Sequence, residues 1–235
     1  MNERLRLEID DDGVAVLTLA HPPLNIYDLR MRDELIEVFA AIAVHPDVRA
    51  MVLAADGKHF SAGADLKEFG TAESVLAARR IRWSHDPWTP LWELPQPTVV
   101  ALHGYALGAG LEMSLLCDVR CASADTVLGL PETRLGMLPS AGGTQSLART
   151  IPPGAAVGVV MLGENMTADE ALRRGIIDII ATDVDAHARA IARSMASADS
   201  TVSRIARRAL RLADDVPLED GLRQERLLAA RARRV

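Results

Sequence analysis

The 235-residue chain is predicted to fold as an α/β protein in which alternating strands and helices are followed by a C-terminal helical portion. Short apolar runs bounded by turn residues indicate buried strands, and apolar residues at helical spacing indicate the helices between them. Twice, a strand leads into a loop of small residues and then into a helix, once around Ala62 and once around Ala109. Near residue 145 the pattern changes to almost continuous helix. Together these observations predict a spiral α/β core with helices at its C-terminal end.

The segment before the first loop of small residues supplies three strands and one helix. Two apolar runs around the turn residue Gly13 indicate a hairpin of strands. Consecutive prolines at 22 and 23 then exclude regular structure, and Asp28 is expected to cap a helix that stops before Pro46. The next apolar run has turn residues on both sides, which is typical of a buried parallel strand. The predicted strands are 5–9, 14–19 and 50–55, and the predicted helix is 28–45.

The same order follows around the second loop. A helix is predicted over 72–94, with interruptions at Pro87 and Pro90 because proline lacks the N–H that a helix interior needs. A strand at 97–104 leads into the Ala109 loop and a helical segment at 111–117. The later predicted strands are 118–123, 127–130 and 176–180, and the later predicted helices are 144–150, 153–162, 167–174, 185–197, 200–213 and 217–231.

Composition is that of a globular protein and argues against nucleic acid as the main partner. The chain is 49% hydrophobic and 25% charged, with a net charge of −6. Cys117 and Cys121 are interpreted as buried small apolar residues in a reducing compartment. The N-terminus is charged, and no apolar run approaches the length of about 18 residues that a membrane-spanning helix needs. A cytoplasmic protein that contacts no membrane is therefore expected.

The two loops of small residues indicate a site that stabilises an oxyanion. Loops that follow parallel strands lie at the same edge of a sheet, so the amides of Ala62 and Ala109 can converge on one oxygen. A thioester carbonyl that becomes an enolate needs such a pair, because negative charge grows on its oxygen during the reaction. The alternative is that the small residues only permit tight packing of strand against helix.

Two acidic residues with apolar neighbours lie close to the second loop. Glu112 falls near the first turn of its predicted helix, and Glu132 follows Pro131 at another helix start. Either carboxylate alone is explained by the favourable helix dipole. Read together, they indicate acid–base chemistry, because burial would raise their pKa values toward the useful range.

Other polar residues in these segments have simpler interpretations. Asp65 is expected to cap a helix that begins at Leu66, and Ser140 is expected in a turn. His59 and His103 are candidate bases without an evident partner. The chain lacks the G-x-S-x-G elbow, the Walker loop, the HExxH metal motif and the dinucleotide fingerprint.

Three segments in order resemble the crotonase, or enoyl-CoA hydratase/isomerase, superfamily, and the resemblance covers nearly the whole chain. They are KHFSAGADLKEF (58–69), HGYALGAGLEMSLLCDVRCAS (103–123) and LPETRLGMLPSAGGTQSLAR (130–149). The resemblance implies a crotonase-like spiral of ββα units over 1–180. It also implies a shortened C-terminal helical trimerisation region over 181–235, in homotrimers that often pair into hexamers. The implied substrate is an acyl-CoA, so coenzyme A is part of the substrate, and no metal or redox cofactor is implied.

The resemblance also implies roles for single residues. Ala62 and Ala109 match the two oxyanion-hole positions. Glu112 matches the acid that positions and activates water, and Glu132 matches the acid that delivers or removes the proton at Cα. The segment that contacts acyl-CoA is matched by Ala62, Gly63, Ala64, Asp65, Leu66 and Gly108.

Both acids are present, which favours reversible hydration of a trans-2-enoyl-CoA to a 3-hydroxyacyl-CoA. The alternatives are enoyl-CoA isomerisation, another crotonase-type reaction, or acyl-CoA binding without catalysis. The acyl group is left open: Trp83, Trp88 and Trp92 indicate either a bulky pocket lining or packing between helices or subunits. Typical family members continue into a further helix that covers the pocket and contacts the CoA phosphates. The basic residues that would replace that contact are Arg231, Arg233 and Arg234.

Overall fold

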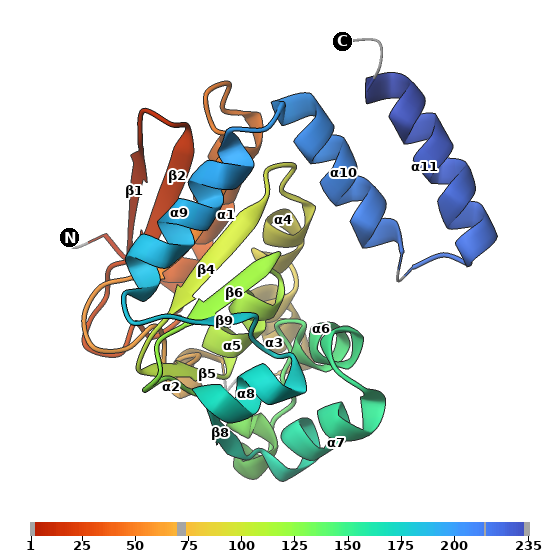
Figure 1. The fold of residues 1–235 in the computed structure, drawn as a ribbon. Coiled ribbons are helices and arrows are strands. Elements are labelled where there is room, and N and C mark those ends of the chain that lie inside the picture. Colours follow the sequence, from red (N-terminus) through yellow and green to blue (C-terminus); the bar gives the residue numbers. More distant parts are fainter. Residues whose placement is uncertain (1–2, 70–73, 214, 233–235) are drawn as a thin grey trace.

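The computed structural model describes residues 3–69, 74–213 and 215–232 (Figure 1). Its larger sheet has six strands among these residues, and all neighbouring strands are parallel except the first pair. In spatial order they are β1 (Leu5–Ile9), β2 (Val14–Leu19), β3 (Ala50–Ala55), β4 (Thr98–Leu102), β6 (Val119–Ala122) and β9 (Ile179–Ile180). The predicted mixed α/β architecture is confirmed.

Both faces of this sheet are covered, which explains why its central strands are apolar throughout. Every residue of β2, β3 and β4 is buried. On one face lies helix α9 (Val184–Ala196), whose Ala188, Ala192 and Ala196 let it approach the strands closely. The main core lies on the other face and includes helix α1 (Leu29–Val44).

Helix α1 forms as the sequence predicts. The side chain of Asp28 accepts a hydrogen bond from the Met31 N–H at 2.8 Å, which satisfies one of the free donors at the helix start. Leu35, Phe39 and Ile42 recur at helical spacing and are buried in the main core.

A smaller sheet of three strands lies beside the main one, and two of its strands were not predicted. It consists of β5 (Tyr105–Leu107), β7 (Val127–Gly129) and β8 (Asn165–Thr167). Strands β5 and β8 have three residues each, too few for an alternating pattern to be visible. The predicted strand 97–104 therefore ends at Leu102, and β5 is a separate strand that leads into the Ala109 loop.

The predicted helix 72–94 is two helices, α3 (Val75–Arg82) and α4 (Trp88–Glu93). The predicted start of this helix at 72 and 73 lies outside the described residues. Pro87 does mark the break, but the expected interruption at Pro90 is wrong. Pro90 is the third residue of α4, where an N–H would have no partner within the helix, so proline costs no hydrogen bond there.

Eight further helices belong to the described part of the chain. Helix α5 begins at Ala109, two residues before its predicted start. The helices not yet given are α2 (Leu66–Phe69), α5 (Ala109–Leu115), the 3-10 helix η1 (Pro131–Leu135), α6 (Gly143–Thr150), α7 (Pro153–Leu162), α8 (Ala168–Arg174), α10 (Ser200–Leu212) and α11 (Leu218–Ala232).

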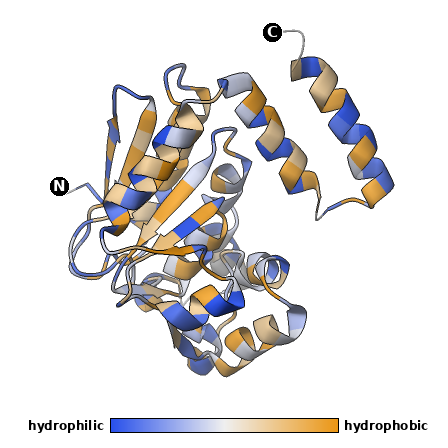
Figure 2. Cartoon of the chain, in the orientation of Figure 1, coloured by the Kyte–Doolittle hydropathy of each residue, from blue (hydrophilic) through white to orange (hydrophobic). Residues whose placement is uncertain are grey.

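Helices α10 and α11 pack on each other and form a C-terminal arm beside the core (Figure 1). Both helices carry a mixture of apolar and polar residues along their length (Figure 2). Two arginines of α10 join the arm to the core through one carboxylate. Arg207 Nε lies 2.6 Å from Asp118 Oδ2, and Arg211 Nη2 lies 3.1 Å from Asp118 Oδ1. The predicted division of the chain at residue 180 stays a prediction.

Candidate active site

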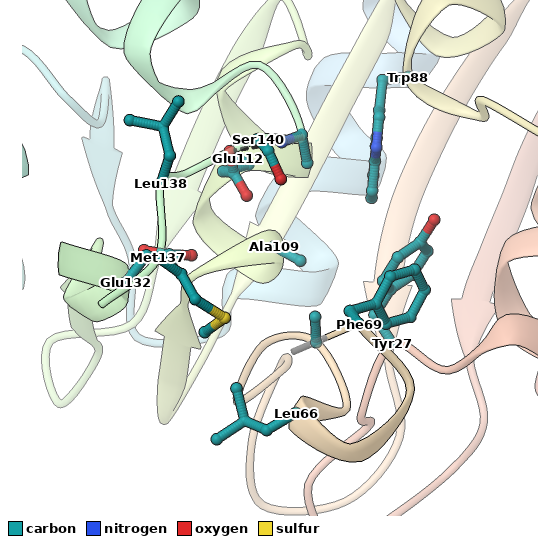
Figure 3. A pocket seen from close by; sticks show the side chains of 12 residues that line it. Tyr27, Leu66, Phe69, Trp88, Ala109, Glu112, Glu132, Met137, Leu138 and Ser140 are labelled. Carbon is teal, nitrogen blue, oxygen red and sulfur yellow. Dashed lines mark hydrogen bonds between the residues drawn. The ribbon is translucent and has the colours of Figure 1, made fainter. Parts of the chain in front are cut away.

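One cavity brings together residues from both loops of small residues, from η1 and from the segment before α6 (Figure 3). Ala64 comes from the first loop and Ala109 from the second. Glu112 on α5 and Glu132 on η1 also line this cavity, as does Ser140. The sequence therefore placed the two acids correctly beside each other, although they are 20 positions apart in the chain.

Glu112 is held rigidly by backbone donors. Its side chain lies in the first turn of α5, and the residue is only 2% exposed. Oε1 accepts hydrogen bonds from Ala141 N–H at 2.9 Å and from Gly143 N–H at 2.8 Å. A Cβ at position 143 would lie 2.8 Å from the same oxygen, so glycine is needed for this approach. Because Oε1 is occupied twice, Oε2 is the oxygen that remains for chemistry.

Glu132 contrasts with Glu112 because its carboxylate has little support. It follows Pro131 in the first turn of η1, as predicted. Oε2 is buried and makes no hydrogen bond to any described residue. Gly108 lies against the other oxygen, since a Cβ at 108 would be 2.7 Å from Oε1, and its φ of +51° also favours glycine. An unpartnered carboxylate oxygen in an apolar cavity is available to a bound molecule.

The electrostatics of the pair favour retention of a proton. Burial, and to a lesser extent the negative charge of Glu132, raise the pKa of Glu112 from its ordinary 4.5 to about 8, although the two backbone donors oppose the shift. Burial also raises the pKa of Glu132. The two carboxyls can therefore retain one proton between them, so that one donates a proton while the other accepts one.

Ala109 presents a free backbone donor, but Ala62 does not. Ala109 is the first residue of α5, and no hydrogen bond among the described residues uses its N–H. The N–H of Ala62 donates to the Leu24 carbonyl at 2.9 Å. Ala62 also lies outside the lining of the cavity that holds both acids. The expectation that its amide is available to an oxyanion is therefore wrong in this geometry.

The available donor in the first loop is the amide of Ala64. This residue pairs with Tyr27 in an isolated parallel bridge. The neighbouring bonds run from Tyr27 N–H to the Gly63 carbonyl at 3.0 Å and from Asp65 N–H to the Tyr27 carbonyl at 2.9 Å. In an extended segment alternate N–H groups point in opposite directions, so that of Ala64 points away from this pairing. No hydrogen bond among the described residues uses it.

The predicted acyl-CoA-contacting residues do lie together. A groove next to the cavity is lined by Ala62, Gly63, Ala64, Asp65, Leu66 and Gly108. It shares Ala64, Leu66 and Glu132 with the cavity, so the two are continuous. Asp65 has the predicted capping role, because its Oδ1 accepts from the Lys67 N–H at 2.7 Å at the start of α2.

Aromatic residues that the sequence did not single out form one wall of the cavity. The ring centroid of Tyr27 lies 5.0 Å from that of Phe69 and 4.9 Å from that of Trp88 (Figure 3). Tyr27 precedes the capping residue of α1 and Phe69 ends α2, and nothing in their local pattern indicates a shared cavity. Trp88 is one of the three tryptophans for which the sequence leaves open a bulky pocket lining or packing between helices or subunits, and it lines the cavity.

The candidate histidines lie elsewhere. The His59 ring stacks on Tyr105 at 4.2 Å, and its Nδ1 accepts from the Tyr105 N–H at 3.1 Å. The Nε2 of His103 lies 3.2 Å from the Gly57 carbonyl oxygen. Neither histidine lines the cavity of the two acids. Both have local partners, and neither has a place in the site.

The described residues contain neither a cluster suited to a metal ion nor a helix suited to crossing a membrane. No group of three or more His, Cys, Asp or Glu side chains there is placed to hold a metal ion. The prediction that the reaction uses no metal or redox cofactor stays a prediction. Among the helices described, none has both the length and the apolar character needed to cross a membrane.

Comparison with known proteins gives close relatives over most of the chain. The sequence model of the enoyl-CoA hydratase/isomerase family matches residues 10–232. The 2,3-dehydroadipyl-CoA hydratase of Escherichia coli is 37% identical over 218 residues, 92% of this chain and 85% of that protein. The (E)-benzylidenesuccinyl-CoA hydratase of Thauera aromatica is 36% identical over 92% of this chain and 85% of its own length.

Solved structures agree with these relatives. The crystal structure of an enoyl-CoA hydratase from Bacillus anthracis superposes with a TM-score of 0.90 at 31% identity, and the match covers 97% of this chain and 90% of that chain. Fold and site together define a protein of the crotonase class. Within that class, the chain belongs to the enoyl-CoA hydratase/isomerase family.

Proposed function

We propose that this protein catalyses the reversible hydration of a trans-2-enoyl-CoA to the 3-hydroxyacyl-CoA. One observation carries the proposal: two carboxyl groups with raised pKa values and two free backbone donors line a single cavity. Hydration needs both kinds of group, because water must be activated at one carbon while charge on the thioester oxygen is stabilised. In this proposal the CoA portion lies in the groove beside the cavity, next to these groups.

In the proposed mechanism the amides of Ala64 and Ala109 hold the thioester oxygen. The reacting form is the one in which the proton of the pair is on Glu132 and Glu112 is ionised. Glu112 accepts a proton from a water molecule whose oxygen forms a bond to Cβ. The Cα=Cβ double bond becomes an enolate, and Glu132 then gives its proton to Cα. Glu112 ends protonated and Glu132 ends ionised, so transfer of one proton between them or through solvent restores the starting state. Loss of one donor from such an oxyanion hole typically raises the barrier by about 2.7–4 kcal/mol.

The relatives support hydration, since those of Escherichia coli and Thauera aromatica are both named as CoA hydratases. Enoyl-CoA isomerisation is the second candidate, because the family includes isomerases. Isomerisation moves one proton and needs only one positioned acid. The rigid placement of Glu112 by two backbone donors, opposite Glu132, favours hydration.

The test is turnover of crotonyl-CoA in water enriched with oxygen-18, with mass detection of the product. Hydration incorporates one labelled oxygen at Cβ. A 3-enoyl-CoA substrate run in parallel detects isomerisation, whose product carries no label. Formation of the 2-enoyl product without any labelled hydroxyacyl-CoA would replace hydration by isomerisation. Binding of acyl-CoA with no turnover of either substrate would make the protein a non-catalytic binding protein.

A crystal structure with a saturated acyl-CoA tests the assignment of the donors. We expect the thioester oxygen within hydrogen-bond distance of the nitrogen atoms of Ala64 and Ala109. An oxygen bound instead by Ala62 N, with the Leu24 bond broken, would restore the assignment made from sequence.

We also propose that the protein assembles as a homotrimer or a hexamer and acts in the cytoplasm, as the family resemblance implies. The mass of the particle in analytical ultracentrifugation tests the assembly. A monomer at micromolar concentration would contradict it.

A further inference from the structure

A second cavity continues from the first one, past Trp88. It shares Trp88, Ser140 and Ala141 with the cavity of the two acids. Its other lining residues include Trp83 and Trp92, so all three tryptophans of the chain surround it. An acyl group that starts at the two acids and extends away from the CoA groove therefore has a path along the face of Trp88.

Aromatic side chains are concentrated along this path. The chain has three tryptophans, two tyrosines and three phenylalanines. Five of these eight line the two cavities, namely Tyr27, Phe69, Trp83, Trp88 and Trp92. Several are also accessible to a ligand: Trp83 is 62% exposed and Trp92 is 37% exposed.

The polar groups of the second cavity disfavour an acyl group that ends in a carboxylate. Asp86 is the charged residue of its lining, and it is an acid. The Asp86 carboxylate accepts hydrogen bonds from the Trp88 N–H at 2.8 Å and from the Thr89 hydroxyl at 2.6 Å. Both of its oxygens therefore bind the start of α4. No described Lys, Arg or His lines this cavity. An acyl group ending in a carboxylate would meet a like charge and no cation, whereas a neutral ring would not.

We propose that the natural substrate is a 3-aryl-2-enoyl thioester, whose ring lies along Trp88 between the two cavities. A planar ring conjugated with the enoyl group matches flat aromatic walls, and aromatic pairs attract beyond the effect of buried area alone. This inference rests on the proposed hydratase function and specifies its substrate class.

The kinetic test uses the dehydration direction, in which conjugation of the product favours the reaction. From 3-hydroxy-3-phenylpropanoyl-CoA, the Cα–H and Cβ–O bonds break, water leaves, and the cinnamoyl thioester forms. We expect kcat/KM for this substrate to exceed that for 3-hydroxyoctanoyl-CoA by about tenfold or more. Turnover of the alkyl substrate with equal or higher kcat/KM would overturn the inference and leave the hydratase function intact.

Binding gives an answer that does not depend on catalysis. Saturated 3-phenylpropanoyl-CoA and octanoyl-CoA cannot react, and their Kd values can be measured by calorimetry. We expect the aryl thioester to bind at least tenfold more tightly, and equal affinities would overturn the inference. If no enoyl-CoA is turned over while the aryl preference persists in binding, the proposed hydration fails and the ligand class stands.

Variants of the tryptophans test whether the second cavity causes the preference for the aryl thioester. The preference is the Kd of octanoyl-CoA divided by the Kd of 3-phenylpropanoyl-CoA. Trp83→Leu should reduce this ratio severalfold, and Trp88→Leu should reduce it further. Tyr105→Leu is the matched control, because Tyr105 is a half-exposed aromatic residue that stacks on His59 outside both cavities. An unchanged ratio in both tryptophan variants, or an equal fall in the control, would overturn the assignment of the second cavity.

Discussion

The active-site cavity and the docking site of the C-terminal arm both bury carboxyl groups, but they supply opposite surroundings. Glu112 and Glu132 face each other without a cation, and their pKa values are raised. Asp118 is also largely buried, yet the charges of Arg207 and Arg211 overcome that burial and hold its pKa below the usual range. One site keeps a proton for chemistry, while the other keeps a charge that fixes a helix.

The difference shows which buried acids are costly for folding. Asp118 Oδ2 accepts from the Thr98 N–H at 2.8 Å and from the Thr98 hydroxyl at 3.0 Å, besides Arg207 Nε. Glu132 Oε2 has no partner among the described residues. Unpaired buried polar groups are retained where a reaction needs them, because folding alone would favour their removal.

Removal of either active-site carboxylate should have the largest effect. Glu132→Gln and Glu112→Gln each should lower kcat for crotonyl-CoA hydration by about 10²–10⁴-fold, the usual contribution of a positioned acid or base. Circular dichroism should show that both variants remain folded, because glutamine has the same shape. Near-wild-type kcat in both variants would contradict the acid–base roles.

Removal of the carboxylate at the arm should affect stability instead. Asp118→Asn leaves the buried Arg207 and the partly buried Arg211 without their anion. Loss of one partner of a buried ion pair typically costs about 3–5 kcal/mol. Urea denaturation measures this loss in the free energy of unfolding. An unchanged unfolding midpoint would show that the arginines are not held by Asp118.

Glu112 should make the free energy of unfolding fall as pH rises, whereas an acid paired with a cation, such as Asp118, has the opposite effect. Because the folded pKa of Glu112 is raised to about 8 from 4.5, the folded state binds more protons than the unfolded state between these values. Its contribution to the free energy of unfolding therefore falls as pH rises, by up to about 1.4 kcal/mol per pH unit.

The matched comparison is Glu112→Gln, which lacks this titration. From pH 6 to pH 7 the free energy of unfolding of the variant, measured by urea denaturation, should rise relative to that of the wild-type protein by up to about 1.4 kcal/mol. Parallel pH profiles of the two proteins would show that Glu112 titrates normally.

An exposed ion pair should have the smallest effect. Arg223 lies 3.6 Å from Glu219 and 3.5 Å from Asp220 on α11, and its side chain is 65% exposed. Arg223→Ala should change the free energy of unfolding by no more than about 0.5 kcal/mol, because water screens such pairs. A loss comparable to that of Asp118→Asn would remove the contrast between buried and exposed carboxylates.

The sequence predicted the acids of the site better than its amides. Glu112 and Glu132 were found because acids with apolar neighbours at two helix starts form a distinct pattern. The donor was assigned to Ala62 rather than Ala64, because residue type cannot show which N–H of an extended loop is already bonded. That information lies in the pairing with Leu24 and Tyr27, residues almost 40 positions away.

Most of the fold can be predicted because most of its elements depend on residues that are close together in the sequence. Buried strands such as β3 and capped helices such as α1 are encoded within one short segment. Strands β5 and β8 depend on pairing with β7, so their three residues carry no periodic signal. The aromatic wall depends in the same way on contacts between α2, α4 and the segment before α1.

One contact of the arm reaches the second cavity. The Arg211 guanidinium of the arm stacks on Trp92 at 3.7 Å, and Trp92 also lines the second cavity. A molecule in the second cavity whose affinity depends on this stacking would therefore change how firmly the arm docks, and by thermodynamic linkage the docked arm would change that molecule's affinity by the same factor. Trp92 is at once a wall of the second cavity and a docking contact of the arm.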